Sequence, residues 1–584
     1  MYANVNAEKS GYSPALPDLS AGVAAERRTA PALKHLGDRP APCPRLSSRR
    51  DLPGGFFPRQ AHPPSSANTP MSTPPDALPF ADLPALLAGH ARTRPQALAL
   101  VVGSRRVSYA EFDALVDRVA ASLQRDGLAP QQVIAICAGT SVAYLAVFLG
   151  ALRAGLAVAP LAPGSTAAQL LDMARDADAQ RFFIDGEVAA ALNSAGLKVP
   201  ASLPVTRLET LENADAEPAW LLPAPARPAP VVIDPAWAFN LIYSSGTTGT
   251  PKGIVQAHAM RWAHIQRAAL SGYDAGTVTL IATPLYSNTT LVAVIPTLAQ
   301  GGCVVMMPKF DSGAYLQLAQ AERATHTMLV PVQYQRLMAR PDFDQHELSS
   351  FRMKMCTSAP FHAALKADVL ARWPGGLVEY YGMTEGGGTC ILQAHLHPTK
   401  LHTVGQPAEG HDIRLIDEQG REVTQVGDSG EVVGRSAGMM TGYHKQPAKT
   451  AEAEWHDAQG LRFIRTGDVG RFDADGFLTL HDRRKDMVIS GGFNIYPSDL
   501  EAVLRGHPAI ADAAVVGIAS AEWGETPVAF VVKRDGHADS ADALRQWFNA
   551  QVGKTQRLSG LRLIDELPRS AIGKVLKREL REAW

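Results

Sequence analysis

Cysteine is scarce in this sequence, and its five residues stand far apart, at Cys43, Cys137, Cys303, Cys356 and Cys390. None forms a Cys-x-x-Cys pair, and no Cys/His group has the spacing of a zinc site. This spacing argues against a disulfide scaffold and against a structural zinc site. Scattered thiols are typical of a reducing compartment, so we expect a cytoplasmic protein.

Long apolar runs and net charge are lacking as well. The longest apolar stretch, residues 142–158, is interrupted by Arg153 and punctuated by Gly150 and Gly155. It is too short and too broken to span a bilayer, and it predicts a buried helix followed by a turn and a strand.

Lys plus Arg (56) nearly balances Asp plus Glu (57). This balance argues against nucleic acid or another polyanion as the partner.

The first 75 residues lack any persistent apolar period. Pro, Ser, Ala and Arg recur there, which is typical of a disordered tail. No apolar segment marks a signal peptide. Domain-like sequence begins soon after Met71. We therefore expect Met71 to be the true start, or the residues before it to form a loose tail.

The rest of the chain is long enough for several cores, with 46% hydrophobic and 19% charged residues. From Phe80 to about residue 390, helical periods alternate with short β-rich runs, which predicts parallel sheets covered by helices. From about residue 400 the sequence is β-rich, and Asp475-Gly476 indicates a hairpin turn. The last hundred residues show an α+β pattern. Its predicted elements are helix 498–506, strands 512–518 and 527–533, and helix 541–552.

The most informative segment is residues 241–253, LIYSSGTTGTPKG. An apolar strand leads into a loop whose glycines permit positive φ angles and expose successive amides, and such amides form an anion-binding nest. This composition suits a polyphosphate. The loop differs from the P-loop of NTPases because Thr-Pro separates the second glycine from the lysine. The predicted contacts are Ser244, Ser245, Gly246, Thr247, Thr248, Gly249 and Lys252.

This loop resembles the phosphate loop of the acyl-adenylate-forming superfamily, which includes acyl- and aryl-CoA ligases, nonribosomal-peptide adenylation domains and luciferases. Several further motifs follow in the same order, so the resemblance covers roughly residues 80–584. It implies an α/β fold with a large N-terminal domain, residues 76–484, of α/β subdomains and a β-rich, distorted-barrel subdomain. A small, mobile C-terminal α+β domain, residues 485–584, is expected to follow. ATP, Mg²⁺ and coenzyme A are the implied cofactor and substrates.

The second motif is YYGMTE, residues 380–385. The resemblance implies that Tyr381 stacks on adenine, with Gly382 and Met383 beside it, and that Thr384 and Glu385 contact the metal and phosphate. A hydroxyl next to a carboxylate suits Mg²⁺, which binds through few carboxylates together with phosphate oxygens. The turn Thr357-Ser358-Ala359-Pro360 matches the family's adenine cradle, so Ser358, Ala359 and Pro360 are further candidates.

The third motif is RTGD, residues 465–468, with DRRKD at 482–486. By resemblance, Asp468 binds the ribose hydroxyls and Arg483 is a second ribose or phosphate contact. Lys485 falls at the hinge about which the small domain swings.

Two motifs belong to the C-terminal domain. SGGFNIYP begins at Ser490, and by resemblance Gly491 and Gly492 line the pantetheine tunnel. PRSAIGK ends at Lys574, which by resemblance bridges the carboxylate and the α-phosphate. A cation there stabilises charge in the transition state. The implied catalytic residues are Lys574, Thr248 and Glu385.

The acyl pocket departs from the family pattern. Where members often carry PLFH, this chain has PLYS, so Ser287 replaces the usual histidine. The candidates by position are Tyr286, Ser287, Asn288, Val330, Gly386 and Gly387. The triple glycine 386–388 is expected to make room for a wide or long acyl group. No charged residue stands out in the sequence for a second carboxylate.

The expected function is ATP-dependent activation of a fatty or aromatic carboxylic acid, followed by thioester formation with coenzyme A and release of AMP and pyrophosphate. An acid–carrier-protein ligase and a non-catalytic nucleotide-binding paralogue are the alternatives, and a homodimer stays open. The absence of a fused carrier domain favours free CoA. Intact Lys252, Glu385, Asp468 and Lys574 argue against the paralogue.

Overall fold

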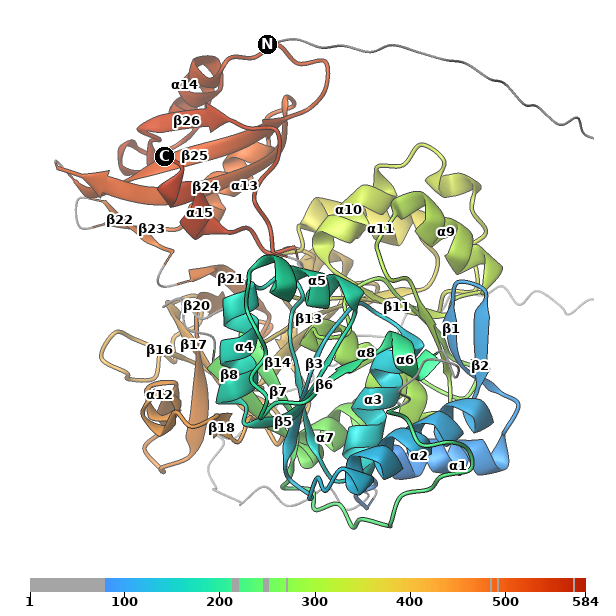
Figure 1. Cartoon of the computed structure of the whole chain (residues 1–584). Helices are drawn as coiled ribbons and strands as arrows, with labels where there is room; N and C mark the ends of the chain where they lie inside the picture. The colour runs from blue at the N-terminus through green and yellow to red at the C-terminus, as the bar shows by residue number, and fades with distance from the viewer. Residues whose placement is uncertain are drawn as a thin grey trace, which may run out of the picture. The chain divides into compact units, whose positions relative to one another are not determined.

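The computed structural model describes residues 79–212, 220–244, 252–268, 271–483, 486–490, 493–521, 523–570 and 573–584. The predicted tail, residues 1–75, lies outside the described residues. Within the described part, the strands form four sheets, of nine, seven, five and five strands (Figure 1).

The nine-stranded sheet has the order β15-β14-β13-β12-β11-β9-β10-β1-β2. Strands β13 to β1 in this order run parallel, and the strands at both edges are antiparallel. The bounds are β1 (Leu98–Val102), β2 (Arg105–Ser108), β9 (Val278–Ile281), β10 (Cys303–Met306), β11 (His326–Leu329), β12 (Met353–Cys356), β13 (Gly376–Gly382), β14 (Thr389–Gln393) and β15 (Gln406–Pro407).

The seven-stranded sheet has the order β18-β8-β7-β4-β3-β5-β6. Strands β7 to β6 in this order run parallel, whereas β7 and β8 form an antiparallel hairpin that β18 extends. The bounds are β3 (Val133–Cys137), β4 (Ala157–Pro160), β5 (Ala179–Ile184), β6 (Val205–Arg207), β7 (Ala238–Ser244), β8 (Lys252–Ala257) and β18 (Gly442–Tyr443).

The two five-stranded sheets follow later in the chain. The first is antiparallel and consists of β16 (Asp412–Ile416), β17 (Ser429–Arg435), β19 (Glu454–His456), β20 (Arg462–Phe472) and β21 (Leu478–Arg483). The second consists of β22 (Val488–Ser490), β23 (Phe493–Ile495), β24 (Ile510–Ser520), β25 (Gly524–Lys533) and β26 (Gly560–Leu563).

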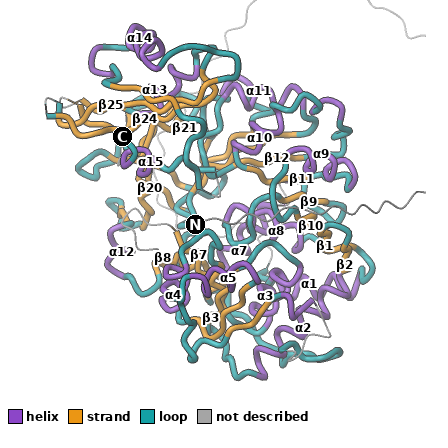
Figure 2. Tube along the Cα trace, turned by 45° about the horizontal axis from the view of Figure 1, so that its top comes forward, coloured by secondary structure: helices purple, strands orange, loops and turns teal. Residues whose placement is uncertain are grey.

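Helices cover the two large sheets in layers. Side chains of α1, α2, α3 and α8 form one core with strands of both large sheets. On its other face the nine-stranded sheet packs against α9, α10 and α11, and the seven-stranded sheet packs against α4 and α5. Figures 1 and 2 both show α9–α11 across the strands from α7 and α8. The predicted α/β architecture of parallel sheets covered by helices is confirmed.

The described helices have the following bounds: α1 (Leu83–Thr93), α2 (Tyr109–Arg125), α3 (Val142–Arg153), α4 (Ala167–Asp176), α5 (Gly186–Ser194), α6 (Glu209–Glu212), α7 (His258–Ala268), α8 (Asn288–Ala299), α9 (Ser312–Ala321), α10 (Pro331–Met338), α11 (Ala363–Arg372), α12 (Pro447–Glu452), α13 (Pro497–Arg505), α14 (Ala541–Gln551) and α15 (Lys577–Glu582). Single turns of 3₁₀ helix are η2 (Phe343–Gln345), η3 (Pro398–Lys400) and η4 (Lys554–Gln556).

The long apolar stretch forms α3 and then β4, as predicted. Ser141 caps α3 by accepting a hydrogen bond from the backbone N–H of Tyr144, and residues 142–152 are all buried. Gly150 lets α3 approach α2, because a Cβ on it would lie 2.6 Å from Cγ1 of Val119. Among the described helices, none combines the length and the apolar character that a bilayer span requires.

The C-terminal elements also match the sequence. Helix α13, strands β24 and β25, and helix α14 begin and end within three residues of the predicted helix 498–506, strands 512–518 and 527–533, and helix 541–552. Apolar side chains from these elements form a core of their own, which includes Leu500, Val515, Val531 and Phe548. The domain boundary at residue 484 stays a prediction.

Candidate functional site

The predicted phosphate loop connects two paired strands. The register of β7 and β8 sets Ser244 opposite Lys252. Ser245, Gly246, Thr247, Thr248 and Gly249 lie outside the described residues, as does the side chain of Ser244. The loop therefore leaves and re-enters the seven-stranded sheet at one end of a hairpin, with Lys252 as the first residue of β8.

Lys252 and Glu385 meet at one tyrosine. The ammonium nitrogen of Lys252 lies 4.8 Å from the ring centre of Tyr443, and the Tyr443 hydroxyl donates a 2.9 Å hydrogen bond to Oε1 of Glu385. Burial, and next the carboxylate of Glu385, raise the pKa of Tyr443, so its phenol keeps its proton. Gln256, also on β8, donates through Nε2 to the carbonyl oxygen of Thr384 at 2.7 Å. The hairpin that carries the phosphate loop is thus tied directly to the YYGMTE motif.

A second tyrosine connects two predicted nucleotide residues. The Tyr381 hydroxyl donates a 2.9 Å hydrogen bond to Oδ2 of Asp468. Burial, and next Asp468, raise the pKa of this tyrosine well above its ordinary value. Asp468 pairs with Arg483 in the β20–β21 ladder, although the side chain of Arg483 lies outside the described residues. The structure therefore brings Tyr381, Asp468 and the backbone of Arg483 together, and Gly382 and Met383 follow Tyr381 directly.

The turn after β12 lies beside the start of α8. Ser358 adopts a positive φ of 82°, and its hydroxyl lies 2.6 Å from that of Thr289. Thr357 donates through its hydroxyl to the backbone carbonyl of Tyr380 at 2.8 Å. These contacts join the turn to α8 and to β13, with Ala359 partly exposed and Pro360 exposed at its end.

The acyl-pocket candidates have different structural roles. Ser287 is buried and caps α8, where its side chain accepts from the backbone N–H of Thr289. Asn288 follows it, and its buried Oδ1 atom has no hydrogen-bond partner. Tyr286 is partly exposed, and burial raises the pKa of its phenol. An unpaired buried acceptor in a loop that begins a helix is unusual, so Asn288 is the strongest contact candidate of the three.

The triple glycine has a packing reason. A Cβ on Gly386 would lie 1.9 Å from the carbonyl oxygen of Gly438, and one on Gly387 would lie 2.5 Å from Cβ of Ile464. Gly386 also has a φ of 72°. The space into which these side chains would point is filled by backbone, by Met260 and by Ile464. A wider acyl pocket at these glycines stays a prediction. The glycines allow the chain after Glu385 to lie against the β17–β20 region.

Lys574 lies in a turn close to one acyl-pocket candidate. The backbone N–H of Lys574 donates to Oγ of Ser570, and the carbonyl of Lys574 accepts from the backbone N–H of Ser570. A Cβ on the preceding Gly573 would stand 3.0 Å from Cγ1 of Val332 and 3.4 Å from Cγ2 of Val330. Lys485, Gly491 and Gly492 lie outside the described residues.

Several residues at this site carried no sequence signal. Tyr443 is one of them, because nothing in the sequence gave it a chemical role. Arg261, His264 and Arg267 on α7, together with His411, form a basic cluster beside the glycine segment. The arginines and histidines of α7 would normally predict a solvent-facing helix. The sequence alone therefore could not predict this buried cluster.

A metal site made by protein alone is not present in the described part of the chain, where no group of three His, Cys, Asp or Glu side chains converges. Thr384 and Glu385 do fit the donor set that Mg²⁺ prefers, because Mg²⁺ keeps water and phosphate oxygens as most of its ligands. Glu385 presents Oε1 to the Tyr443 hydroxyl.

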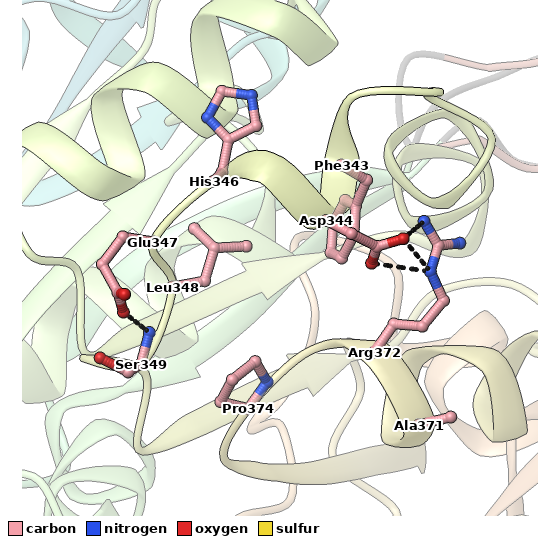
Figure 3. Close-up of a pocket in the computed structure, with 9 residues that line it drawn as sticks. All are labelled: Phe343, Asp344, His346, Glu347, Leu348, Ser349, Ala371, Arg372 and Pro374. Carbon is pink, nitrogen blue, oxygen red and sulfur yellow. Dashed lines mark hydrogen bonds and ion pairs between the residues drawn. The ribbon is translucent and has the colours of Figure 1, made fainter.

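A surface cavity of about 540 Å³ lies elsewhere, near η2 and the end of α11 (Figure 3). Its polar groups pair with one another: Arg372 Nε lies 3.0 Å from Oδ1 of Asp344, and the Ser349 N–H donates to Glu347 at 2.9 Å. None of the predicted site residues lines it, so it is not the site described above.

Comparison with known families gives two matches in chain order. The family described as AMP-binding enzyme matches residues 87–444, and the AMP-binding enzyme C-terminal domain matches residues 499–574. Both ranges agree with the order of the motifs, since Lys252, Glu385 and Tyr443 fall in the first and Lys574 ends the second.

Comparison with individual proteins gives matches over nearly the whole of each relative. Feruloyl-CoA synthase of Amycolatopsis sp is 34% identical over 505 residues, which cover 85% of this chain and 97% of that protein. Indoleacetate–CoA ligase of Aromatoleum aromaticum is 31% identical, with 84% and 96% covered. The crystal structure of ATP-bound MatB from Rhodopseudomonas palustris superposes with a TM-score of 0.76 at 28% identity and covers 86% of this chain and 99% of MatB.

Proposed function

The chain belongs to the AMP-binding enzyme family, and on that premise we propose that it activates a fatty or aromatic carboxylic acid with ATP and transfers the acyl group to coenzyme A. The observation that carries this proposal is the convergence of Lys252, Tyr443 and Glu385 at the end of the hairpin that bears the phosphate loop. The feruloyl-CoA synthase and indoleacetate–CoA ligase relatives support CoA as the acceptor.

The first step joins the acid to AMP. A carboxylate oxygen of the acid attacks the α-phosphorus, the bond from that phosphorus to the bridging oxygen breaks, and pyrophosphate leaves. Lys252 and the loop residues Ser244–Gly249 bind the phosphates, with Thr248 among the catalytic residues. Tyr381 stacks on adenine beside Gly382, Met383 and the turn Ser358–Pro360. Asp468, which the Tyr381 phenol orients, and Arg483 bind the ribose.

Thr384 and Glu385 hold Mg²⁺ in this proposal. The ion supplies neutralisation of phosphate charge when it is bound. The Tyr443 hydroxyl fixes one oxygen of Glu385, so the carboxylate cannot rotate freely away from the phosphates. Lys252 lies against the same ring and adds a second positive charge on that side.

Lys574 serves the first step and the paired glycines serve the second. Lys574 neutralises the acid carboxylate and the α-phosphate, which repel each other. Its turn lies close to Val330, which supports a place beside the acyl group. In the second step the CoA sulfur attacks the acyl carbon and AMP leaves, while Gly491 and Gly492 line the thiol's path after a swing about Lys485. The reducing cytoplasm suits this chemistry, and the described cysteines are unpaired thiols.

A panel of acids tests this function. Pyrophosphate release is measured for fatty, aromatic and hydroxycinnamic acids, with and without CoA and with a phosphopantetheinyl carrier protein in place of CoA. The proposal predicts multiple turnovers only when acid, ATP and CoA are all present. Turnover that needs the carrier instead would identify a carrier-protein ligase, and no acid-dependent pyrophosphate release with any acid would contradict the enzyme function.

A further inference from the structure

One face of α7 runs along the glycine segment after Glu385. Met260, His264 and Arg267 are spaced four and three residues apart, so they lie on the same face of the helix. At one end, Cε of Met260 lies 2.8 Å from where a Cβ on Gly386 would stand. At the other end, Nη1 of Arg267 lies 2.6 Å from Nε2 of His411. The helix face therefore spans the stretch from Gly386 to the neighbourhood of His411.

The positive charge on this helix has no carboxylate partner among the described residues. Arg261 is buried and donates only to the neutral oxygens of Asn240 and Gln256, and its Nη1 has no partner. Arg267 contacts the imidazole of His411 instead of an acid. Burial lowers the pKa of both guanidinium groups, that of Arg261 to about 9. Charges held inside a protein without a counter-charge are unfavourable, and an anion that enters the site removes that cost.

In the contact between Arg267 and His411, two hydrogen-bond donors lie next to each other, Nη1 of Arg267 and Nε2 of His411. The backbone N–H of Thr389 donates to Nδ1 of His411 at 2.8 Å, so the proton of the neutral imidazole is on Nε2. That N–H faces Nη1 of Arg267, which can only donate. His264 adds a buried Nδ1 atom with no partner. A carboxylate that lies beside this pair, with one oxygen facing Nη1 of Arg267 and the other facing Nε2 of His411, would give each donor an acceptor.

The cluster is within reach of a small molecule. His264, Arg267, Tyr380, Thr389 and His411 all keep part of their surface accessible to solvent. Tyr380 directly precedes the proposed adenine-stacking residue, and its hydroxyl lies 3.2 Å from Oγ of Ser271. Both imidazoles are neutral, because burial and then neighbouring arginines lower the pKa of His264, and burial and then Arg267 lower that of His411 to about 4. The positive charge that a ligand would meet in this cluster therefore comes from the arginines and not from the histidines.

We propose that Arg267, together with His264 and His411, binds a second carboxylate at the far end of the acid, so that the substrate is a dicarboxylic acid. This inference rests on the proposed function, in which the reacting carboxylate meets Lys574 and the ATP phosphates, whose Mg²⁺ is held by Thr384 and Glu385. Gln256, two residues before α7, reaches Thr384, whereas Arg267 lies near the end of the helix. Seven residues separate Met260 from Arg267, a rise of about 10 Å. The site therefore selects a long diacid over a short one.

Matched acids test the inference on the unaltered enzyme. Acid-dependent pyrophosphate release with CoA is compared for octanedioate, octanoate, succinate and 4-hydroxycinnamate. We expect kcat/KM for octanedioate to exceed that for octanoate by about thirtyfold or more, and succinate to be poor. A lower value for octanedioate than for octanoate or 4-hydroxycinnamate overturns the dicarboxylate assignment while leaving the ligase function intact. No release with any acid is instead the failure of the proposed function.

Two variants locate the selectivity. Arg267→Met should reduce the octanedioate-to-octanoate ratio by about thirtyfold or more, and Arg267→Lys should reduce it less, since lysine keeps the charge but not the two-donor fork. Arg175→Met on the exposed face of α4 is the matched control and should leave the ratio unchanged. An unchanged ratio in Arg267→Met would overturn the proposal.

A second readout does not depend on turnover. Octanedioate should raise the thermal midpoint of the unaltered enzyme and of Arg175→Met but not that of Arg267→Met. Without ligand, Arg267→Met should melt at the same or a higher temperature, because it removes an uncompensated charge. An equal octanedioate shift in Arg267→Met would contradict the site, even if its activity had changed.

Discussion

Two tyrosines connect the chemically important side chains of this protein. Tyr381 and Tyr443 each donate a hydrogen bond to one carboxylate, that of Asp468 and that of Glu385. A phenol with a raised pKa is a donor at any ordinary pH, so each tyrosine fixes one oxygen of its carboxylate. The tyrosines therefore orient the acids before ATP arrives.

Lys252 gives a prediction at this scale. Lys252→Ala should lower kcat/KM for ATP by about 10²–10³-fold, because it removes a positive charge beside the phosphates. The thermal midpoint should hardly change, since the contact described for the ammonium group is with the face of the Tyr443 ring. Lys445→Ala, which removes a half-exposed lysine near the same strand ends, is the control. Equal ATP kinetics in Lys252→Ala and the unaltered enzyme would remove Lys252 from the phosphate site.

Buried histidines make stability depend on pH. Burial lowers the pKa of His258 and, as the largest effect, that of His326, both to about 4. The folded protein holds them neutral, whereas the unfolded chain protonates them below about pH 6.5. Between these values the unfolded state binds more protons, so stability is lost as pH falls from about 6.5 to 4, by up to about 3 kcal/mol for each histidine.

The thermal midpoint measured from pH 7 to pH 4.5 checks this. His326→Gln should show a smaller drop than the unaltered protein over this range, because glutamine cannot take up the proton. Its amide can still donate to the Ser271 carbonyl, as Nε2 of His326 does at 3.1 Å. If the thermal midpoint falls equally with pH in His326→Gln and in the unaltered protein, His326 does not contribute to the acid sensitivity.

At the scale of elements, one buried ion pair positions β13, the strand that carries the proposed adenine-stacking residue Tyr381. Lys366 on α11 pairs with Glu379 on β13, two residues before Tyr381. Lys366 also donates to the carbonyl oxygens of Leu401 at 2.8 Å and Thr403 at 3.0 Å. Burial raises the pKa of Glu379 to about 7, against the opposing effect of Lys366. The lysine therefore joins α11, β13 and the chain that leads to β15.

Removing one partner of the Lys366–Glu379 ion pair should lower the free energy of unfolding. Lys366→Met leaves a buried carboxylate without its cation, and we expect a loss of about 3–5 kcal/mol in the free energy of unfolding. The double variant Lys366→Met/Glu379→Leu should recover most of it, because no unpaired charge remains. Denaturant unfolding measures both, with exposed Lys309→Met as a control that stays within about 0.5 kcal/mol. A double variant as unstable as the single one would show that the carbonyl contacts of Lys366, and not the charge, matter.

Elements with a strong local pattern were predictable from the sequence. The apolar run that forms α3 and β4 and the short apolar runs that form β24 and β25 are recognisable from their hydrophobicity and length. The contacts that complete the site were not predictable. Arg267 and His411 are distant in sequence and meet only because α7 lies along the glycine segment. The packing role of the glycines was not predictable either, since it comes from the close approach of Gly438 and Ile464.

On the scale of the whole molecule, the site draws on segments from most of the chain. Lys252, Glu385, Asp468 and Lys574 come from separate parts of the sequence, and their order was readable from motifs. The distances between these residues could not be predicted, because a contact such as that of Tyr443 with Glu385 leaves no pattern in the local sequence. The turn of Gly573 and Lys574 lies close to Val330, as the proposed role of Lys574 in the first step requires.

The central claim is a two-step reaction in which Lys574 serves only the first step, and single-turnover kinetics of Lys574→Ala test it most directly. Acyl-adenylate formation from acid and ATP is measured by rapid quench, and thioester formation is measured separately from supplied acyl-adenylate and CoA. The account predicts that Lys574→Ala slows the first step by about 10²–10³-fold and leaves the second near its normal rate, whereas the exposed control Lys554→Ala changes neither. Equal damage to both steps, or none to the first, would contradict it.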